Sequence, residues 1–261
     1  MVVFFDIDGT IIDDKTQIIP PSTVKAVEAL RAHGHIPVVN TGRPYSHIDP
    51  RVRQMAFSAY VCGCGMEIRL RDQWLWRKIP DAHLCAFVRQ QAEKYNIFPL
   101  YEADDGSIAY DPIRCCHPAL TEEVRRMRAK GFGVHTIQEH PMFMKFVIWS
   151  GDASRAQSFC RQMEPYFEVI YRGGGGFTEF VLKGCSKAAG MTGLLEALGV
   201  PKSDTLAIGD STNDLPMFSV AAHTACLGGG MEELKAVSEY VTAPVLEDGI
   251  QKALTHFGLL E

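Results

Sequence analysis

The sequence predicts an α/β protein in which helices cover both faces of a parallel sheet and an α+β segment is inserted in the middle of the chain. Two observations favour the sheet. Short apolar runs alternate with stretches of helical periodicity near both ends of the chain, and acidic or hydroxyl residues follow several of those runs. A third observation favours the insertion, since helical and strand-like stretches mix between residues 81 and 182 without acids at the strand ends.

The first element is an apolar run from Val2 to Phe5, which predicts a buried strand. It leads directly into the segment D-x-D-G-T, which begins at Asp6. In an extended chain Asp6 and Asp8 point the same way, so their carboxylates repel unless one is protonated or a cation lies between them. A charged loop after a strand is the simpler interpretation of two such acids taken alone.

A helix and a second strand follow. We expect Ser22 to cap a helix whose apolar residues recur at helical spacing until Gly34, and residues 35–40 predict another buried strand. Strand, helix and strand in this order form the unit of a parallel sheet, whose working site lies at the carboxyl ends of the strands. The segment Thr41-Gly42-Arg43 stands at such an end, although a threonine there is often only a turn or cap residue.

The middle of the chain predicts a strand at 59–62, a hairpin around 71–73 and then the insertion. Within the insertion the patterns predict helices at His83–Tyr95, Thr121–Lys130 and Ala153–Met163, and strands at Phe143–Trp149, Glu168–Tyr171 and Phe177–Leu182. The glycine run Gly173–Gly176 is typical of a flexible turn. A phosphate cradle is the alternative, although no P-loop lysine follows it.

A lysine-rich segment precedes a helix that is predicted over residues 188–198. Ser186 is expected as the N-cap of this helix. Lys187 then lies in the first turn, where backbone N–H groups and an ammonium together favour an anion. Lys183 is the alternative cation in the same segment.

The last motif follows a strand predicted at residues 205–208. The segment G-D-x-x-N-D begins at Gly209 and places Asp210, Asn213 and Asp214 where this strand ends. Two acids therefore cluster at a strand end for the second time. A capped loop before a short helix is the purely structural interpretation.

Taken in order, these four motifs resemble those of the haloacid dehalogenase (HAD) superfamily, the aspartate-based phosphohydrolases. The insertion and the tail are similar to the cofactor-type (Cof-like) subgroup of type IIB. This resemblance covers the whole chain. It implies a Rossmann-like catalytic core formed by residues 1–80 and 183–261, and a C2-type cap formed by residues 81–182.

The resemblance also implies roles for individual residues. Asp6 would attack phosphorus and form an aspartyl-phosphate, and Asp8 would act as general acid and then as general base. Lys187 is favoured over Lys183 as the lysine that steadies the nucleophile and the phosphoryl oxygens. The residues implied in substrate binding are Thr41, Gly42, Arg43 and Asn213.

A metal site follows if the four motif aspartates, Asp6, Asp8, Asp210 and Asp214, converge. Like charges ~4 Å apart repel by ~4 kcal/mol per pair at an effective dielectric near 20, and a hard divalent cation relieves this repulsion. A site whose ligands are all oxygen atoms favours Mg²⁺ over zinc. The resemblance assigns to Mg²⁺ the carboxylates of Asp6 and Asp210 and the backbone carbonyl of Asp8, with Asp214 in the surrounding shell.

The expected function is Mg²⁺-dependent hydrolysis of a small phosphorylated metabolite, with sugar phosphates the commonest choice in the family. Two alternatives stay open: a phosphomutase or phosphotransferase, and a non-catalytic protein that binds phosphorylated metabolites. Arg114, His117 and Lys145 are candidates for polar contacts made by the cap.

Composition excludes other classes. The chain has 261 residues, of which 46% are hydrophobic and 22% charged, and its net charge is −5. We expect neither nucleic acid nor membrane as a partner, because no basic field is present and no apolar run approaches the ~20 residues of a membrane span. The beginning of the chain lacks a signal-peptide pattern, so we expect a cytoplasmic protein.

The eight cysteines lack the paired C-x₂-C spacing of zinc sites, and we expect reduced, mostly buried thiols. The segment Cys115-Cys116-His117 is a weak indication of a metal site.

Overall fold

The structure, a computed structural model, describes residues 1–114, 117–172 and 177–260. It divides into two compact units. Unit 1 combines Met1–Arg77 with the chain from Ser186 onward, and unit 2 is Lys78–Cys185. The predicted boundaries, at residues 80 and 182, lie three residues from these two junctions. Cys115, Cys116 and the run Gly173–Gly176 lie outside the described residues, and so do the metal and phosphate interpretations that involve them.

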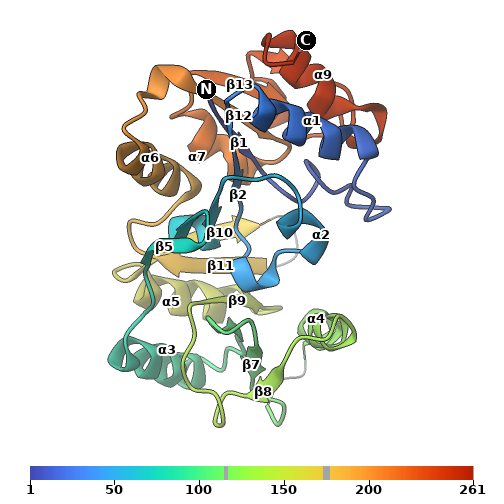
Figure 1. Cartoon of the computed structure of the whole chain (residues 1–261). Helices are drawn as coiled ribbons and strands as arrows, with labels where there is room; N and C mark the ends of the chain where they lie inside the picture. Colours follow the sequence, from blue (N-terminus) through green and yellow to red (C-terminus); the bar gives the residue numbers. More distant parts are fainter. Residues whose placement is uncertain (115–116, 173–176, 261) are drawn as a thin grey trace. The chain divides into compact units, whose positions relative to one another are not determined.

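Unit 1 is built on one sheet of eight strands, in the order β14-β13-β12-β1-β2-β3-β4-β5. Figure 1 shows its strands β13, β12, β1 and β2 together with α1 and α9. The bounds are β1 Val2–Phe5, β2 Ile36–Asn40, β3 Ala59–Cys62, β4 Glu67–Leu70, β5 Gln73–Arg77, β12 Thr205–Gly209, β13 His223–Cys226 and β14 Tyr240–Val241. The strands from β14 to β3 are parallel, whereas β4 and β5 form the antiparallel hairpin predicted from the sequence. Strand β1 lies between β12 and β2, so the D-x-D-G-T segment emerges inside the sheet and not at its edge.

Helices cover both faces of this sheet, which confirms the doubly wound α/β fold. The bounds are α1 Pro21–Ala32, α2 Pro50–Arg53, α6 Lys187–Leu198, α7 Leu215–Phe218, α8 Glu232–Lys235 and α9 Gly249–His256. Alternate residues of β1 point to opposite faces. Val3 and Phe5 pack in the cluster that includes α1 and α9, and Val2 and Phe4 pack in the cluster that includes α6 and α7.

The two predicted helix caps have different outcomes. The prediction for Ser22 is wrong: α1 begins at Pro21, Pro20 is its N-cap, and the buried Ser22 hydroxyl has no partner among the described residues. Proline suits this first position because its fixed φ is helical and its missing N–H would be unpaired there anyway. The prediction for Ser186 is confirmed, since its hydroxyl accepts a hydrogen bond from the N–H of Ala189 at 3.0 Å.

Unit 2 has a sheet of six strands in the order β10-β11-β9-β6-β7-β8. The bounds are β6 Leu100–Glu102, β7 Ile108–Tyr110, β8 Val134–Thr136, β9 Lys145–Trp149, β10 Phe167–Arg172, β11 Phe177–Leu182, α3 Ala82–Lys94, α4 Pro118–Ala129 and α5 Ala153–Met163. Phe146 and Ile148 pack with α3 and α5, whereas Val147 packs with α4, so helices cover both faces here too. Strands β6, β7 and β8 were not predicted because three residues are too few for an alternating pattern to emerge.

Within the described part of the chain, every helix falls short of the length and apolarity that a membrane crossing requires. Six described cysteines are buried free thiols: Cys62, Cys64, Cys85, Cys160, Cys185 and Cys226.

Candidate active site

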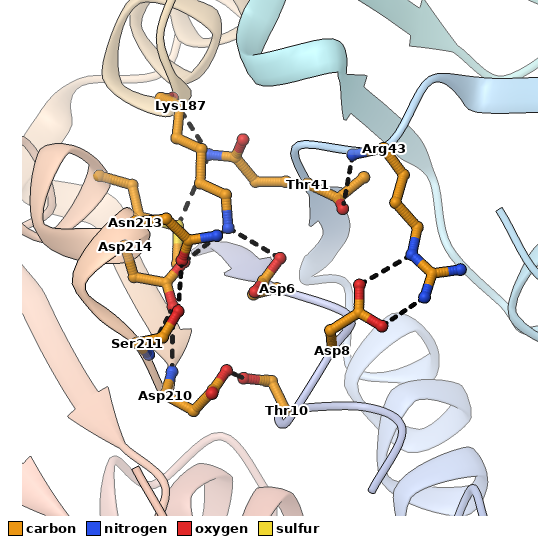
Figure 2. Close-up of polar contacts among 12 residues, drawn as sticks. Asp6, Asp8, Thr10, Thr41, Arg43, Lys187, Asp210, Ser211, Asn213 and Asp214 are labelled. Carbon is orange, nitrogen blue, oxygen red and sulfur yellow. Dashed lines mark hydrogen bonds and ion pairs between the residues drawn. The ribbon is translucent and has the colours of Figure 1, made fainter. Parts of the chain in front are cut away.

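Three of the predicted aspartates come together in unit 1, beyond the ends of β1 and β12 (Figure 2). These two strands are parallel neighbours, and the N–H of Asp6 donates to the carbonyl of Ile208 at 3.0 Å. Carboxylate oxygens of Asp6, Asp210 and Asp214 lie within 4.8 Å of one another. The sheet therefore brings together acids that are about two hundred residues apart in the chain.

Lys187 joins this group from the first turn of α6. Its ammonium lies 2.7 Å from Asp6 Oδ1 and 2.6 Å from Asp214 Oδ1, and the residue is only 2% exposed. Lys183, the other candidate, lies in unit 2, where it is exposed and pairs with Glu168 at 3.5 Å. Lys187 is thus the lysine of this segment that the structure places beside the aspartates.

Asp214 is surrounded by donors from the chain itself. Its Oδ1 accepts from Lys187, and its Oδ2 accepts from the N–H groups of Asp210 at 3.0 Å and Ser211 at 3.2 Å. Both of its oxygens are therefore occupied, which suits Asp214 to hold the lysine and the loop. Asn213 lies beside it, half-buried, and its Oδ1 accepts from the Ser211 hydroxyl at 2.7 Å.

The carboxylate of Asp8 does not face the other three. Arg43 forms a two-pronged pair with it: Nε donates to Oδ2 at 2.7 Å and Nη2 donates to Oδ1. Figure 2 shows Asp6 directed toward Lys187 and Asp8 directed toward Arg43. The expectation that Asp6 and Asp8 point the same way is therefore wrong, because β1 ends at Phe5 and the chain bends at Ile7, between the two acids.

Thr41 and Gly42 lie between β2 and Arg43. Thr41 is 1% exposed, its N–H donates to the carbonyl of Val61 at 2.9 Å, and its hydroxyl accepts from the N–H of Arg43 at 3.2 Å. Gly42 is half-buried in the same turn. The hydroxyl of Thr41 has its own proton available for a further acceptor.

Sequence reasoning missed two residues of this site. Thr10 donates from its hydroxyl to Asp210 Oδ1 at 2.9 Å, and Asn40 donates from Nδ2 to the carbonyl of Lys187 at 3.1 Å. The only signal for either was its position within or beside a motif. Gly9 is also constrained, because its φ is +73° and a Cβ there would lie 2.3 Å from an Asp210 oxygen.

The site holds excess negative charge. Burial raises the pKa of Asp6 to about 7 despite the opposing effect of Lys187. Burial, and then the charges of Asp6 and Asp214, raise the pKa of Asp210 to about 8. Burial alone would lower the pKa of Lys187, but the carboxylates of Asp214 and Asp6 raise it above its usual range. Three carboxylates against one ammonium leave two uncompensated charges when all are ionised.

This donor set fits a hard divalent cation. All candidate ligand atoms are carboxylate oxygens, and burial raises the pKa of both Asp6 and Asp210 even with Lys187 beside Asp6, so a further positive charge would favour the ionised carboxylates. Asp6 and Asp210 would hold such an ion, since Asp214 is already occupied by donors of the chain.

A pH dependence of stability follows for the metal-free protein. A carboxyl whose folded pKa lies above its ordinary value near 3.8 favours folding at low pH, and this contribution is lost as the pH rises through the folded pKa, here about 7 for Asp6 and about 8 for Asp210. We therefore expect Tm in EDTA to fall between about pH 4 and about pH 8. Asp210→Asn should shrink the fall, and the exposed Asp204→Asn should not. A Tm that rises over this range would contradict the assignment.

The three residues of unit 2 that are candidates for contacts with a substrate have different partners in the structure. Lys145 is buried and pairs with Glu179, and with Glu102 at 3.8 Å. Arg114 pairs with Asp111 at 2.8 Å and Glu93 at 3.2 Å. His117 has a buried Nδ1 without a partner among the described residues. The assignment of any of them to a substrate stays a prediction.

Comparison with known proteins identifies the family to which the chain belongs. A model of haloacid dehalogenase-like hydrolases matches residues 3–254. A Bacillus subtilis 5-amino-6-(5-phospho-D-ribitylamino)uracil phosphatase, YcsE, is 34% identical over 259 residues, covering 99% of this chain and 96% of its own. A second phosphatase of that name and organism, YitU, is 24% identical over 269 residues, covering 98% and 97%.

Solved structures show the same fold. A phosphatase of the HAD superfamily, BT1666 from Bacteroides thetaiotaomicron, superimposes with a TM-score of 0.86 at 22% identity, over 99% of this chain and 95% of that one. A subclass IIB sugar phosphatase, BT4131, superimposes with a TM-score of 0.81 at 24% identity, over 99% of both chains.

Proposed function

Because the chain belongs to the haloacid dehalogenase-like hydrolases and is a phosphatase of that family, we propose that it hydrolyses small phosphate monoesters with Mg²⁺ through an aspartyl-phosphate on Asp6. One observation carries this proposal. The buried Asp6 carboxylate lies 2.7 Å from the ammonium of Lys187 in a group of three carboxylates. A carboxylate held beside a fixed cation is oriented for attack on an anionic phosphoryl group, which it could not approach alone.

The first half-reaction uses Asp6 and Asp8. An oxygen of Asp6 forms a bond to phosphorus while the bond from phosphorus to the ester oxygen breaks, and Asp8, once released from Arg43 and protonated, gives its proton to the departing alkoxide. Lys187 and the Thr41 hydroxyl donate to phosphoryl oxygens during this transfer. Arg43 holds Asp8 through an exchangeable ion pair, and a phosphate dianion can compete for its guanidinium.

The second half-reaction restores the enzyme. Water attacks phosphorus and gives its proton to Asp8, the bond between Asp6 and phosphorus breaks, and inorganic phosphate leaves. Mg²⁺, when bound by Asp6 and Asp210, supplies positive charge to the phosphoryl oxygens and to the crowded carboxylates.

Sugar or sugar-alcohol phosphates are the proposed substrate class. Two observations support this choice: YcsE and YitU are named for a substrate with a phosphorylated ribityl group, and BT4131 is a sugar phosphatase. Unit 2, the proposed cap, would select among these leaving groups.

The test is release of inorganic phosphate from p-nitrophenyl phosphate and from a panel of sugar, sugar-alcohol and cofactor phosphates. We expect Mg²⁺ to be required, with EDTA lowering kcat/KM by about 100-fold or more, and restored activity when Mg²⁺ is added in excess. Equal rates with and without EDTA would contradict the metal assignment. Phosphate transferred to a second hydroxyl without free phosphate would identify a mutase or phosphotransferase instead.

A further inference from the structure

Asn40 is the last residue of β2 and is completely buried. Its Nδ2 donates to the backbone carbonyl of Lys187 at 3.1 Å and lies 3.6 Å from the sulfur of Met217. The contact joins the end of β2 to the first turn of α6, which lies 147 residues further along the chain. Thr41 follows Asn40 directly, so the end of β2 supplies both this contact to α6 and the threonine of the site.

The other end of the same carboxamide is unpaired. Asn40 Oδ1 is buried and has no hydrogen-bond partner in the described part of the chain. The reverse orientation of the amide would set this oxygen against the carbonyl of Lys187, so the donor must face the helix. A buried unpaired acceptor costs about 1–3 kcal/mol, which an apolar side chain of similar size would avoid. Stability alone therefore does not account for an asparagine here.

Its hydrogen bond fixes the part of the helix that delivers the catalytic ammonium. Lys187 is the first residue of α6, and its side chain must reach both Asp6 and Asp214 at 2.7 and 2.6 Å. Close packing already limits this turn on another side, because a Cβ on Gly65 would lie 2.5 Å from the carbonyl of Ser186. Packing restricts the approach of the helix, and a directed hydrogen bond adds a fixed point on the backbone of Lys187 itself.

We propose that Asn40 is a positioning residue, which holds the backbone of Lys187 so that the ammonium sits between Asp6 and Asp214. It acts through Lys187 and does not touch the substrate. The expected effect on catalysis rests on the proposed function. The expected position of the Lys187 ammonium does not depend on it.

The experiment compares Asn40→Ala with Met217→Leu. Asn40→Ala removes the hydrogen bond to Lys187, whereas Met217→Leu removes only the other contact of the carboxamide and keeps the volume. For Asn40→Ala we expect kcat on p-nitrophenyl phosphate to fall between about tenfold and a hundredfold, with KM changed by no more than about threefold. Tm should stay within about 3 °C of the wild type, because the unpaired oxygen is lost together with the hydrogen bond. Met217→Leu should keep kcat within about twofold.

Asn40→Leu, which keeps the number and branching of the side-chain heavy atoms, replaces the alanine variant if that one does not fold. Crystal structures of the wild type and the variant supply a readout that needs no activity: the ammonium of Lys187 should move by about 1 Å or more from its place between the two carboxylates. An unmoved ammonium, an unchanged kcat, or an equal loss in Met217→Leu overturns the proposal. A wild type without phosphatase activity would sink the proposed function instead, and the displacement of Lys187 would still decide the role of Asn40.

Discussion

Asp6→Asn is expected to lower turnover of p-nitrophenyl phosphate by roughly 10⁴-fold or more, with little change in substrate binding. The amide has nearly the same shape as the carboxylate but cannot attack phosphorus, so the covalent route is closed. The fold should survive, because Lys187 keeps its contact with Asp214 and the amide removes one of three crowded charges. The measurement is kcat and KM with saturating Mg²⁺, together with Tm.

The matched control for this change is Asp204→Asn. Asp204 is exposed and lies just before β12, at the opposite end of that strand from Asp210. It should keep wild-type kcat. In an acid quench of the wild type during turnover, we expect one phosphoryl group on the peptide that contains Asp6, and none in Asp6→Asn. A variant that keeps near-wild-type turnover would show that another group attacks phosphorus.

The strand order of unit 1 explains why the sequence sufficed for much of this site. Asp6 and Asp210 follow β1 and β12, and two parallel neighbours bring their carboxyl ends to the same end of the sheet. Lys187 was placed by a local rule as well, since Ser186 caps α6 and so fixes which lysine opens the first turn. Each of these inferences needed only a strand pattern or a cap beside a motif.

No pattern in the sequence indicates which side chains pair when the two residues are far apart in the chain. Arg43 reaches Asp8 across 35 residues, and Asn40 reaches Lys187 across 147. Both depend on how two loops or elements are brought together, and the residue types alone do not indicate it. The error over Ser22 has a different cause, because a cap rule favoured serine where the two prolines had already set the start of the helix.

Lys187→Met is expected to have the second large effect. The substitution keeps much of the length of the side chain but removes the ammonium from between Asp6 and Asp214. Phosphoryl oxygens then lose a fixed cation in a buried site, for which we expect kcat to fall roughly 10³-fold. Metal-free protein should also lose about 3–5 kcal/mol in its free energy of unfolding at pH 8, since the carboxylates lose their partner. The loss should be smaller at pH 5, where the carboxyls of Asp6 and Asp210, with pKa values raised to about 7 and about 8, take up protons.

Lys183→Met is the matched control for this second change, since it makes the same substitution four residues earlier in the chain. The side chain of Lys183 is 54% exposed and its pair with Glu168 spans 3.5 Å, so its removal should change the free energy of unfolding by no more than about 0.5 kcal/mol. Urea unfolding with EDTA at both pH values, and kcat with Mg²⁺, separate the two lysines. Equal effects of the two substitutions, or a Lys187→Met protein that turns over substrate at the wild-type rate, would mean that a buried ammonium beside Asp6 is not what makes the phosphoryl group accessible to attack.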